Sequence, residues 1–289
     1  MSGIGQGSVG HLGVPGAYTH QAAEELFPQS ALTGFKSFQQ VVRAVEKGDL
    51  DFGVLPVENS TAGRVAEAYQ LLDVMDLQII AEHFVRVQHC LARRPGRSGE
   101  SVRSIMSHPQ ALMQCEEWLR TSHPDANQIN TTDTATAAKE VAASPDPGLA
   151  AICSKRAAEI YGLDIVKTGI QDRDDNTTRF HVLSRGRGPA PVGPAITTLV
   201  FQISHKPGAL IAALTPLSAH NVNVLKLETY MASGQRTAPT FYIDIALNRY
   251  SDEGEKVLSS LSKSTTFLKT VGCYGVSPVR GTVPGFLGL

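Results

Sequence analysis

The sequence predicts an α/β protein whose last third forms a separate ferredoxin-like unit. From residue 9 onward, apolar runs typical of strands alternate with runs of helical spacing, which is the order of a parallel or mixed sheet covered by helices. From Thr197 the order changes to strand, helix, strand, strand, helix, strand, which is the ferredoxin-like plan. A chain of 289 residues has room for two or three such packing units.

Helical and strand-like segments follow one another through the first 184 residues. Phe38, Val41, Val42 and Val45 have the spacing of an amphipathic helix, and Gly48 is placed to end it. Further helices are expected at Tyr18 to Leu26, Pro109 to Leu119, Thr132 to Val141 (N-cap Asp133 or Thr134) and Lys155 to Tyr161. Strands are expected at Val9 to Val14, Leu32 to Phe35, Phe52 to Val57, Gln88 to Ala92, Ser104 to Met106, Leu149 to Cys153 and Thr178 to Leu183. Leu77 to Val87 is expected to be an extended crossing segment, and Ile165 to Thr168 to lead the chain back.

A Gly- and Pro-rich stretch separates this region from the C-terminal unit. Arg185 to Pro194 holds three Gly and three Pro, so it is expected to be a linker rather than a strand or helix. In the C-terminal unit we expect strands at Thr198 to Ser204 and Phe267 to Val276, and helices at Ala209 to Ser218 and around Val257. A hairpin is expected to pair Asn221 to Met231 with Thr240 to Leu247 around Ser233-Gly234-Gln235.

Composition limits the classes of partner. Charged residues make up 18% of the chain and the net charge is -1, so no nucleic-acid-binding patch is expected. No apolar run is long enough to span a bilayer, and the first nine residues lack the pattern of an export signal, so we expect a cytoplasmic protein. Cys90, Cys115, Cys153 and Cys273 form no CxxC pair and no cluster with histidines, so we expect no disulfide, metal site or cofactor.

Two polar clusters that are far apart in sequence border strand-like runs. Glu58-Asn59-Ser60-Thr61 follows the strand that ends at Val57, and Asn176-Thr177-Thr178-Arg179-Phe180 opens the last strand before the linker. A loop at the carboxyl end of a sheet usually faces a crevice. A pocket built from both clusters must then lie where the chain leaves one lobe and later returns to it.

Each of these features has a purely structural alternative. The first cluster also suits the cap of a helix from Ala62, and Arg179 also suits pairing with an aspartate among residues 172–175. The turn from Gly13 to Thr19 lies between a strand and a helix, where backbone N–H groups favour an anion, but it is equally an ordinary turn. His108 suits a helix cap as well as a ligand contact.

In combination, these segments resemble the prephenate dehydratase family of phenylalanine biosynthesis. The resemblance rests on GVPGAYTHQAA (Gly13 to Ala23), DFGVLPVENSTAG (Asp51 to Gly63), SHPQAL (Ser107 to Leu112), DTATAA (Asp133 to Ala138) and NTTRF (Asn176 to Phe180), in the family's order. The C-terminal unit resembles an ACT domain, with PGAL at Pro207 to Leu210. The resemblance implies a catalytic region, residues 8–184, with two α/β lobes like a type II periplasmic binding protein and the active site in the cleft. A linker (185–196), an ACT regulatory domain (197–276) and a tail (277–289) would follow.

The resemblance also implies which residues form the site. Thr178 matches the family's essential threonine, and Glu58, Asn59 and Ser60 match its cleft-lining motif, so these four are the expected catalytic residues. Prephenate loses carbon dioxide and its ring hydroxyl, and a donor must reach that oxygen; Thr178, or Glu58 with a pKa raised by burial, would supply it. Arg179 is expected either to anchor a substrate carboxylate or to brace the loop. The expected substrate-binding residues are Gly16, Ala17, Tyr18, Thr61, His108, Gln110, Thr134, Arg179 and Phe180.

The expected activity is that of a lyase converting prephenate to phenylpyruvate under allosteric control by phenylalanine. The expected effector-binding residues are Pro207, Gly208, Ala209, Leu210, Asn221, Asn223 and Glu228. Many members of the family carry Glu-Ser-Arg-Pro where this chain has Glu228-Thr229-Tyr230-Met231, so the strength of control can differ. A homodimer or homotetramer is expected, because the sheet edges of two ACT domains can join. Arogenate dehydratase activity and a non-catalytic amino-acid sensor on the same fold stay open as alternatives.

Overall fold

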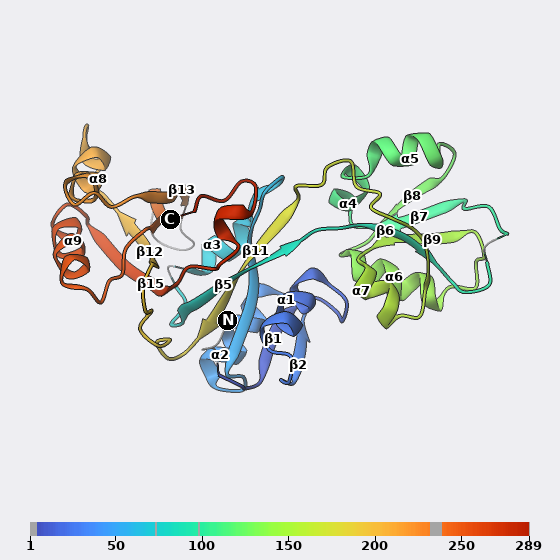
Figure 1. Cartoon of the computed structure of the whole chain (residues 1–289), viewed down its shortest axis with the longest axis horizontal. Coiled ribbons are helices and arrows are strands. Elements are labelled where there is room, and N and C mark those ends of the chain that lie inside the picture. The colour runs from blue at the N-terminus through green and yellow to red at the C-terminus, as the bar shows by residue number, and fades with distance from the viewer. Residues whose placement is uncertain (1–4, 73, 98, 232–238, 289) are drawn as a thin grey trace.

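A computed structural model describes residues 5–72, 74–97, 99–231 and 239–288 (Figure 1). The strands of the first 184 residues are β1 (Val9–Leu12), β2 (Leu32–Phe35), β3 (Phe52–Asn59), β4 (Gly63–Arg64), β5 (Gln78–Arg86), β6 (Cys90–Arg93), β7 (Ser104–Ser107), β8 (Asn127–Asn130), β9 (Leu149–Cys153), β10 (Asp164–Thr168) and β11 (Thr177–Ser184). The helices of this region are α1 (Tyr18–Leu26), α2 (Phe38–Lys47), α3 (Ala66–Leu72), α4 (Pro109–Met113), α5 (Glu116–Ser122), α6 (Thr134–Ala143) and α7 (Lys155–Ile160). The C-terminal part contains β12 (Ala195–Gln202), α8 (Ala209–Ala219), β13 (Val224–Met231), β14 (Pro239–Ile245), α9 (Asp252–Lys263), β15 (Phe267–Gly275) and the 3-10 helix η1 (Arg280–Thr282).

The first lobe is built on the parallel strands β2, β1 and β3, which are followed by antiparallel β11 and then β5. Helix α2 packs against this sheet through the apolar face that its helical spacing predicts. The helix begins after Ser37, whose side chain accepts the N–H of Gln40, and it ends at Gly48 in the left-handed conformation. These local signals explain why its bounds were predictable.

The second lobe holds the smaller sheet, in the order β10-β6-β9-β7-β8 (Figure 1, right). The chain enters this lobe between β5 and β6 and leaves it between β10 and β11. The two crossing segments bond to each other: Val87 N–H donates to the Asn176 carbonyl (2.8 Å), and Gly169 N–H donates to the His89 carbonyl (3.0 Å). The two-lobed α/β arrangement that the resemblance implied is therefore present.

The C-terminal unit has the predicted order β12, α8, β13, β14, α9, β15. Its strands lie in the order β13-β14-β12-β15, and α8 and α9 pack on one face. Strand β15 then meets β5 of the first lobe through one parallel bridge, between Gly272 and Ile79. The C-terminal sheet and the first-lobe sheet therefore form one continuous ten-stranded sheet.

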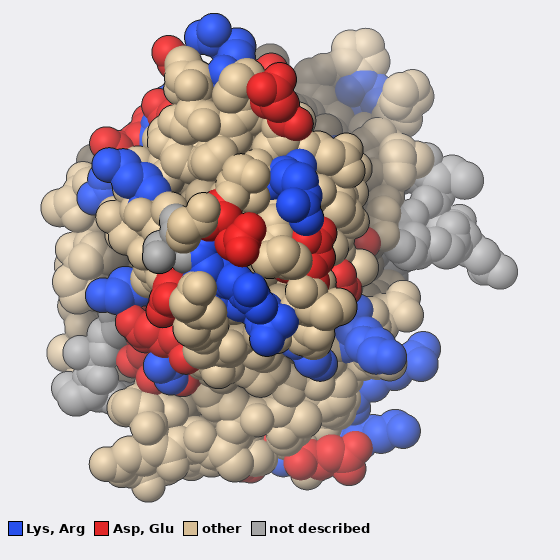
Figure 2. All heavy atoms as spheres, turned by 90° about the vertical axis from the view of Figure 1, so that its right-hand side faces the viewer, with Lys and Arg blue, Asp and Glu red and all other residues tan. Residues whose placement is uncertain are grey.

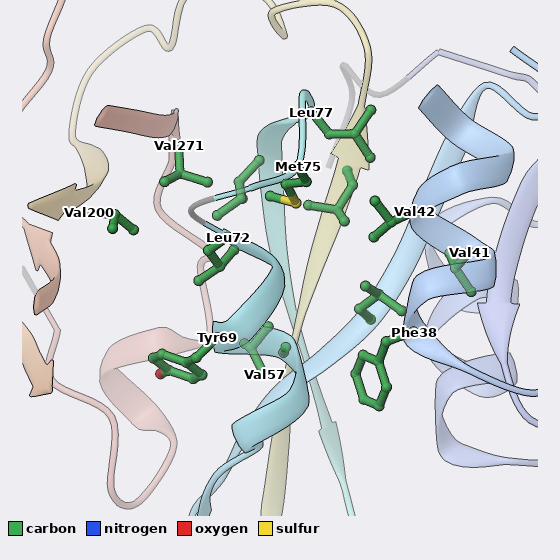
Figure 3. Close-up of a cluster of buried hydrophobic side chains, with 14 of the residues drawn as sticks. Phe38, Val41, Val42, Val57, Tyr69, Leu72, Met75, Leu77, Val200 and Val271 are labelled. Carbon is green, nitrogen blue, oxygen red and sulfur yellow. The ribbon is translucent and has the colours of Figure 1, made fainter. Parts of the chain in front are cut away.

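A hydrophobic cluster crosses from the first lobe into the C-terminal unit (Figure 3). Tyr69 and Leu72 of α3 point to the same interior as Val200 of β12 and Val271 of β15. The Tyr69 ring lies 4.8 Å from the ring of Tyr242, measured between centroids. Because the two parts share this apolar surface, separating them would expose it to water.

The structure departs from the sequence expectations where long-range contacts decide. The helix expected at Pro109 to Leu119 is split into α4 and α5, because the Asp172 carboxylate accepts the N–H groups of Glu117 and Trp118 at the start of α5. Strand β3 continues to Asn59, so half of the first polar cluster lies in a strand and not in a loop. The sequence pattern did not predict β4 or β8, and the helix that it offered as an alternative from Ala62 begins at Ala66, as α3. The expected turn at Ser233-Gly234-Gln235 lies outside the described residues.

Acidic and basic side chains are interspersed on the face of the second lobe that Figure 2 shows, in keeping with the 26 basic and 27 acidic residues of the chain. Within the described ranges, no helix combines the length and the apolar character that crossing a bilayer requires.

Candidate active site

A cleft of about 790 Å³ lies between the two lobes. Val14 and Ala17 line it from the first lobe, His108 and Thr134 line it from the second lobe, and Asn176 lines it from a crossing segment. The cleft therefore lies where the chain leaves one lobe and returns, as the two polar clusters indicated. Helix α6 presents its N-terminus here, with Asp133 as the N-cap.

The two polar clusters come into contact through Asn59 of the first cluster and Thr178 of the second. These two residues face each other across the antiparallel pair β11 and β3, and both line the cleft. The Asn59 Nδ2 group donates to Thr178 Oγ1 (3.0 Å) and to Asn176 Oδ1 (2.7 Å). Asn59 Oδ1 accepts from the hydroxyl of Thr61 (2.7 Å), which fixes the amide orientation. Because Thr178 Oγ1 accepts from Asn59, its own proton can be directed toward a ligand.

A second polar group in the cleft joins Tyr18, His89 and Gln114. The Tyr18 hydroxyl donates to the Gln88 carbonyl (2.6 Å), and His89 Nε2 lies 2.9 Å from Gln114 Oε1. Burial lowers the pKa of His89, although the bond to Gln114 opposes this, so the ring is neutral at neutral pH. Burial, aided by neighbouring cysteines, raises the pKa of Tyr18 well above its usual value. Sequence reasoning missed His89 and Gln114, since neither lies within one of the motifs that carry the resemblance.

The charged side chains of the cleft lining, apart from histidines, are Lys36, Glu67 and Asp133. The Asp133 carboxylate is occupied by helix α6, because it accepts the N–H groups of Ala135 (2.9 Å) and Thr136 (2.8 Å). Lys36 follows β2 at the carboxyl end of the parallel strands and is exposed. Among the described residues it is the one lysine or arginine that lines this cleft.

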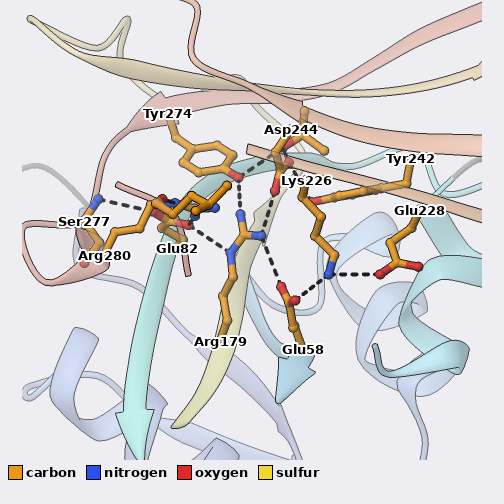
Figure 4. A network of polar contacts seen from close by, with 12 residues as sticks. Glu58, Glu82, Arg179, Lys226, Glu228, Tyr242, Asp244, Tyr274, Ser277 and Arg280 are labelled. Atoms are coloured by element: carbon orange, nitrogen blue, oxygen red, sulfur yellow. Dashed lines mark hydrogen bonds and ion pairs between the residues drawn. The ribbon is translucent and has the colours of Figure 1, made fainter. Parts of the chain in front are cut away.

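Arg179 and Glu58, both expected in the site, are not part of the cleft lining. Their side chains point instead toward residues of the C-terminal unit (Figure 4). Successive residues of a strand point to opposite faces, so Arg179 turns away where Thr178 faces the cleft, and Glu58 does the same beside Asn59. Glu58 pairs with Lys226 of β13 instead. The expectations that Glu58 is the catalytic acid and that Arg179 anchors substrate are therefore corrected. Nor does Arg179 pair with an aspartate of residues 172–175.

Arg179 lies fully buried at the junction with the C-terminal unit (Figure 4). Its guanidinium contacts Glu82 Oε2 (2.9 Å), Asp244 Oδ2 (2.7 Å) and the Tyr274 hydroxyl (2.9 Å). Burial opposes ionisation of Asp244, but the positive charge of Arg179 outweighs it with help from Thr198 and Tyr242, and the pKa of Asp244 falls to about 2. The group is therefore a buried ion-pair network.

The remaining expected residues divide into two groups. Ala17, Tyr18, His108, Gln110, Thr134 and Phe180 line the cleft, whereas Gly16, Ser60 and Thr61 do not. Gly16 lets the lobes approach, because a Cβ atom there would lie 2.7 Å from the Ala157 Cα atom. The Ser60 hydroxyl bonds the Asp175 carbonyl (3.0 Å) and braces the end of β3. His108 Nδ1 also caps α4 by accepting the Gln110 N–H (3.2 Å).

A second cavity, of about 760 Å³, lies in the C-terminal unit. Gly208, Ala209 and Leu210 line it, together with residues that include His205 and Lys206. The other expected effector residues, Pro207, Asn221, Asn223 and Glu228, are not part of this lining. Glu228 instead contacts Lys226 (3.2 Å) at the domain junction. Across the described part of the chain, no three His, Cys, Asp or Glu side chains gather in a way that would hold a metal ion.

Comparisons with known proteins give one family and two kinds of activity. The family described as prephenate dehydratase matches residues 9–187. Arogenate dehydratase/prephenate dehydratase 1, chloroplastic, from Arabidopsis thaliana is 35% identical over 93% of this chain and 72% of the relative. A Komagataeibacter europaeus protein named bifunctional N-acyl-homoserine lactone acylase/prephenate dehydratase is 34% identical over 96% of this chain and 98% of the relative.

Two solved structures share the arrangement of more than nine tenths of this chain. A protein described as a novel type of quorum quenching acylase superposes with a TM-score of 0.86 at 34% identity, over 94% of this chain and 99% of its own. The prephenate dehydratase of Arthrobacter aurescens in complex with L-Phe superposes with a TM-score of 0.85 at 25% identity, over 93% of this chain and 90% of its own.

Proposed function

The chain belongs to the prephenate dehydratase family, and we propose that it is itself a lyase that converts prephenate to phenylpyruvate. The observation that carries the proposal is the Thr178–Asn59 pair. Two motifs that are 119 residues apart place a hydroxyl and an amide 3.0 Å from each other in the cleft between the lobes.

The reaction needs little more than help for a leaving group. The bond from the ring to its carboxylate breaks and carbon dioxide departs. Its electrons complete the aromatic ring as the carbon–oxygen bond to the hydroxyl breaks. The hydroxide takes one proton from solvent and leaves as water, so prephenate and a proton give phenylpyruvate, carbon dioxide and water. Thr178 donates a hydrogen bond to the departing oxygen, and Asn59 positions Thr178; since threonine is a poor acid, the role is stabilisation rather than full proton transfer.

The charges of the cleft fit a substrate with one carboxylate to hold and one to lose. A strong cation on the ring carboxylate would stabilise the ground state and slow its loss. The pyruvyl carboxylate does not react, so a cation can bind it without that cost. We assign Lys36 to the pyruvyl carboxylate, because it is the lysine or arginine that the described cleft lining offers.

Replacement of Thr178 by Ala tests the proposal. We expect turnover of prephenate to fall by about 10²-fold or more, because the donor to the leaving oxygen is lost. Thr121→Ala, at an exposed position on α5, serves as the control and should leave turnover unchanged. Phenylpyruvate formation is measured on both variants after circular dichroism shows that they are folded. Normal turnover by the Thr178 variant would refute the assignment.

The wild-type chain should be assayed in parallel on prephenate, arogenate and an N-acyl-homoserine lactone. Arogenate carries an ammonium group, which Glu67 of the cleft would suit better than Lys36 does. An acylase needs a nucleophile with a base in hydrogen-bond reach, whereas the described partner of Thr178 is an amide that donates to it. Turnover of arogenate alone would make arogenate the substrate. Hydrolysis of the amide bond of the N-acyl-homoserine lactone alone would place this chain with the acylase relatives. Binding of phenylalanine without any turnover would make the chain a sensor.

We further propose that the C-terminal unit is an ACT domain that binds L-phenylalanine beside Gly208, Ala209 and Leu210 and pairs with a second copy of the chain. The second cavity and the L-Phe complex of the Arthrobacter aurescens protein support the first part. Strand β13 lies at the sheet edge and carries the exposed apolar residues Leu227 and Met231, which support the second.

A further inference from the structure

The strands that carry Thr178 and Asn59 are bonded to the C-terminal unit by the residues next to Thr178 and Asn59. Arg179 follows Thr178 and Glu58 precedes Asn59, but neither side chain lines the cleft. Both point toward the C-terminal unit (Figure 4). Arg179 also lies 3.8 Å from Glu58, measured from Nη1 to Oε2. Thr178 and Asn59 therefore lie on one face of this piece of sheet, and Arg179 and Glu58 lie on the other.

All four strands of the C-terminal sheet contribute a side chain to the hydrogen bonds and ion pairs around Arg179 and Glu58. Asp244 of β14 and Tyr274 of β15 bond Arg179 directly, and Lys226 of β13 bonds Glu58. Thr198 of β12 holds the second oxygen of Asp244 (2.6 Å). Asp244 is thus fixed within its own unit and offers its other oxygen to the first lobe.

We propose that Arg179 and Glu58 are positioning residues through which the C-terminal unit sets the geometry of the Thr178–Asn59 pair. The inference rests on the dehydratase function proposed above. A buried charge separated from its partner is strongly disfavoured, so a shift of Asp244 draws the fully buried Arg179 with it. The Lys226–Glu58 pair is partly buried and transmits a shift of Lys226 to Glu58 in the same way. The backbones of β11 and β3 then move, and a displacement of the order of 1 Å at a reacting group is enough to slow a reaction markedly.

Lys226→Met tests the inference without touching the cleft. Methionine keeps most of the lysine stem and removes the charge that holds Glu58. We expect kcat for prephenate to fall about tenfold, with KM within about twofold of the wild type, because positioning and not binding is lost. Lys269→Met is the matched control. Lys269 also reaches from the C-terminal unit to the first lobe, where it donates to the carbonyls of Leu72 (3.1 Å) and Met75 (2.6 Å), and its loss should leave kcat unchanged.

A double-variant measurement separates positioning from general loss of stability. If Lys226 acts through Thr178, Lys226→Met should have almost no further effect on kcat in the Thr178→Ala background. The same tenfold loss in both backgrounds would overturn the inference. If Lys226→Met does not fold, Tyr274→Phe takes its place, because it removes one hydrogen bond to Arg179. It should likewise lower kcat in the wild-type background and have almost no further effect in the Thr178→Ala background.

Hydrogen exchange gives a readout that does not depend on turnover. Peptides covering residues 176–181 should exchange faster in Lys226→Met than in Lys269→Met. If the wild-type protein turns over neither prephenate nor arogenate, but these peptides still exchange faster in Lys226→Met than in Lys269→Met, the proposed function is refuted. The effect of Lys226 on the geometry of the strands is then upheld. If the wild-type protein is active and Lys226→Met has the same kcat and the same hydrogen exchange as the wild type, the positioning role is refuted and the proposed function stands.

Discussion

At the scale of single residues, the direction of a side chain from its strand decides its role. Thr178 and Arg179 are neighbours in sequence, yet one lines the cleft and the other is fully buried among acidic groups behind it. The motif indicated that both residues matter, but not which face each one takes. The face is set by the register of β11 against β3, which places Thr178 opposite Asn59 and includes a bulge between Arg179 and Phe180. Both the register and the bulge depend on the pairing of strands that are far apart in sequence, so the sequence motif alone does not reveal them.

Lys36 provides the residue-scale prediction. Lys36→Gln should raise KM for prephenate by about fivefold and leave kcat nearly unchanged, because an exposed ion pair contributes modestly and the pyruvyl carboxylate does not react. The effect should shrink at high salt, where the charge is screened. Lys47→Gln, at an exposed position in the last turn of α2, is the control. An unchanged KM at low salt would remove Lys36 from substrate binding.

At the scale of elements, the sequence predicted what local signals determine. Helix α2 has its spacing, its Ser37 cap and its Gly48 stop within twelve residues, and its position was predicted. The break between α4 and α5 depends on Asp172, more than fifty residues away, and was missed. The site divides in the same way. Motif residues such as Asn59 and His108 were found, whereas His89, Gln114 and Lys36 reach the cleft only through folding of the lobes.

Strand β11 carries a buried histidine, His181, from which we expect the fold to lose stability in acid. Both ring nitrogens of His181 are without a hydrogen-bond partner in the described structure. Burial, and then the charges of Arg179 and Arg280, lower the pKa of His181 well below 6.5, with Asp244 opposing. In the unfolded chain this ring binds a proton below about pH 6.5, whereas in the folded chain it does so only at a lower pH. The free energy of unfolding should therefore fall by about 1.4 kcal/mol per pH unit below that value.

His181→Phe should remove this share of the acid sensitivity. We measure the free energy of unfolding by urea titration between pH 5 and pH 7 and plot it against pH. The slope should be smaller than in the wild type by up to about 1.4 kcal/mol per pH unit, which corresponds to the uptake of one proton on unfolding. His205→Gln replaces an exposed histidine and should keep the wild-type slope. Equal slopes in the wild type and the His181 variant would mean that His181 is protonated in the folded chain.

At the scale of the whole molecule, the C-terminal unit and the first lobe are joined by extensive contacts, so we expect them to unfold together. They share the hydrophobic cluster around Tyr69 and Tyr242, the ion pairs of Arg179, and the bridge from Gly272 to Ile79. The chain after β15 adds a further contact, because Phe286 packs on Phe84 of β5 with ring centroids 4.9 Å apart. We therefore expect wild-type protein to unfold in one calorimetric transition.

Gly272 is where this continuity can be tested with one methyl group. A Cβ atom at Gly272 would lie 2.3 Å from the Ile79 carbonyl oxygen, so Gly272→Ala must push β15 away from β5. Gly275→Ala, on the same strand, meets nothing within 4 Å and is the matched control. We expect the first substitution to lower the free energy of unfolding by about 1–3 kcal/mol and to broaden or split the transition. If both variants unfold like the wild type, the strand bridge bears little of the coupling, and the ion pairs and the shared core would carry it.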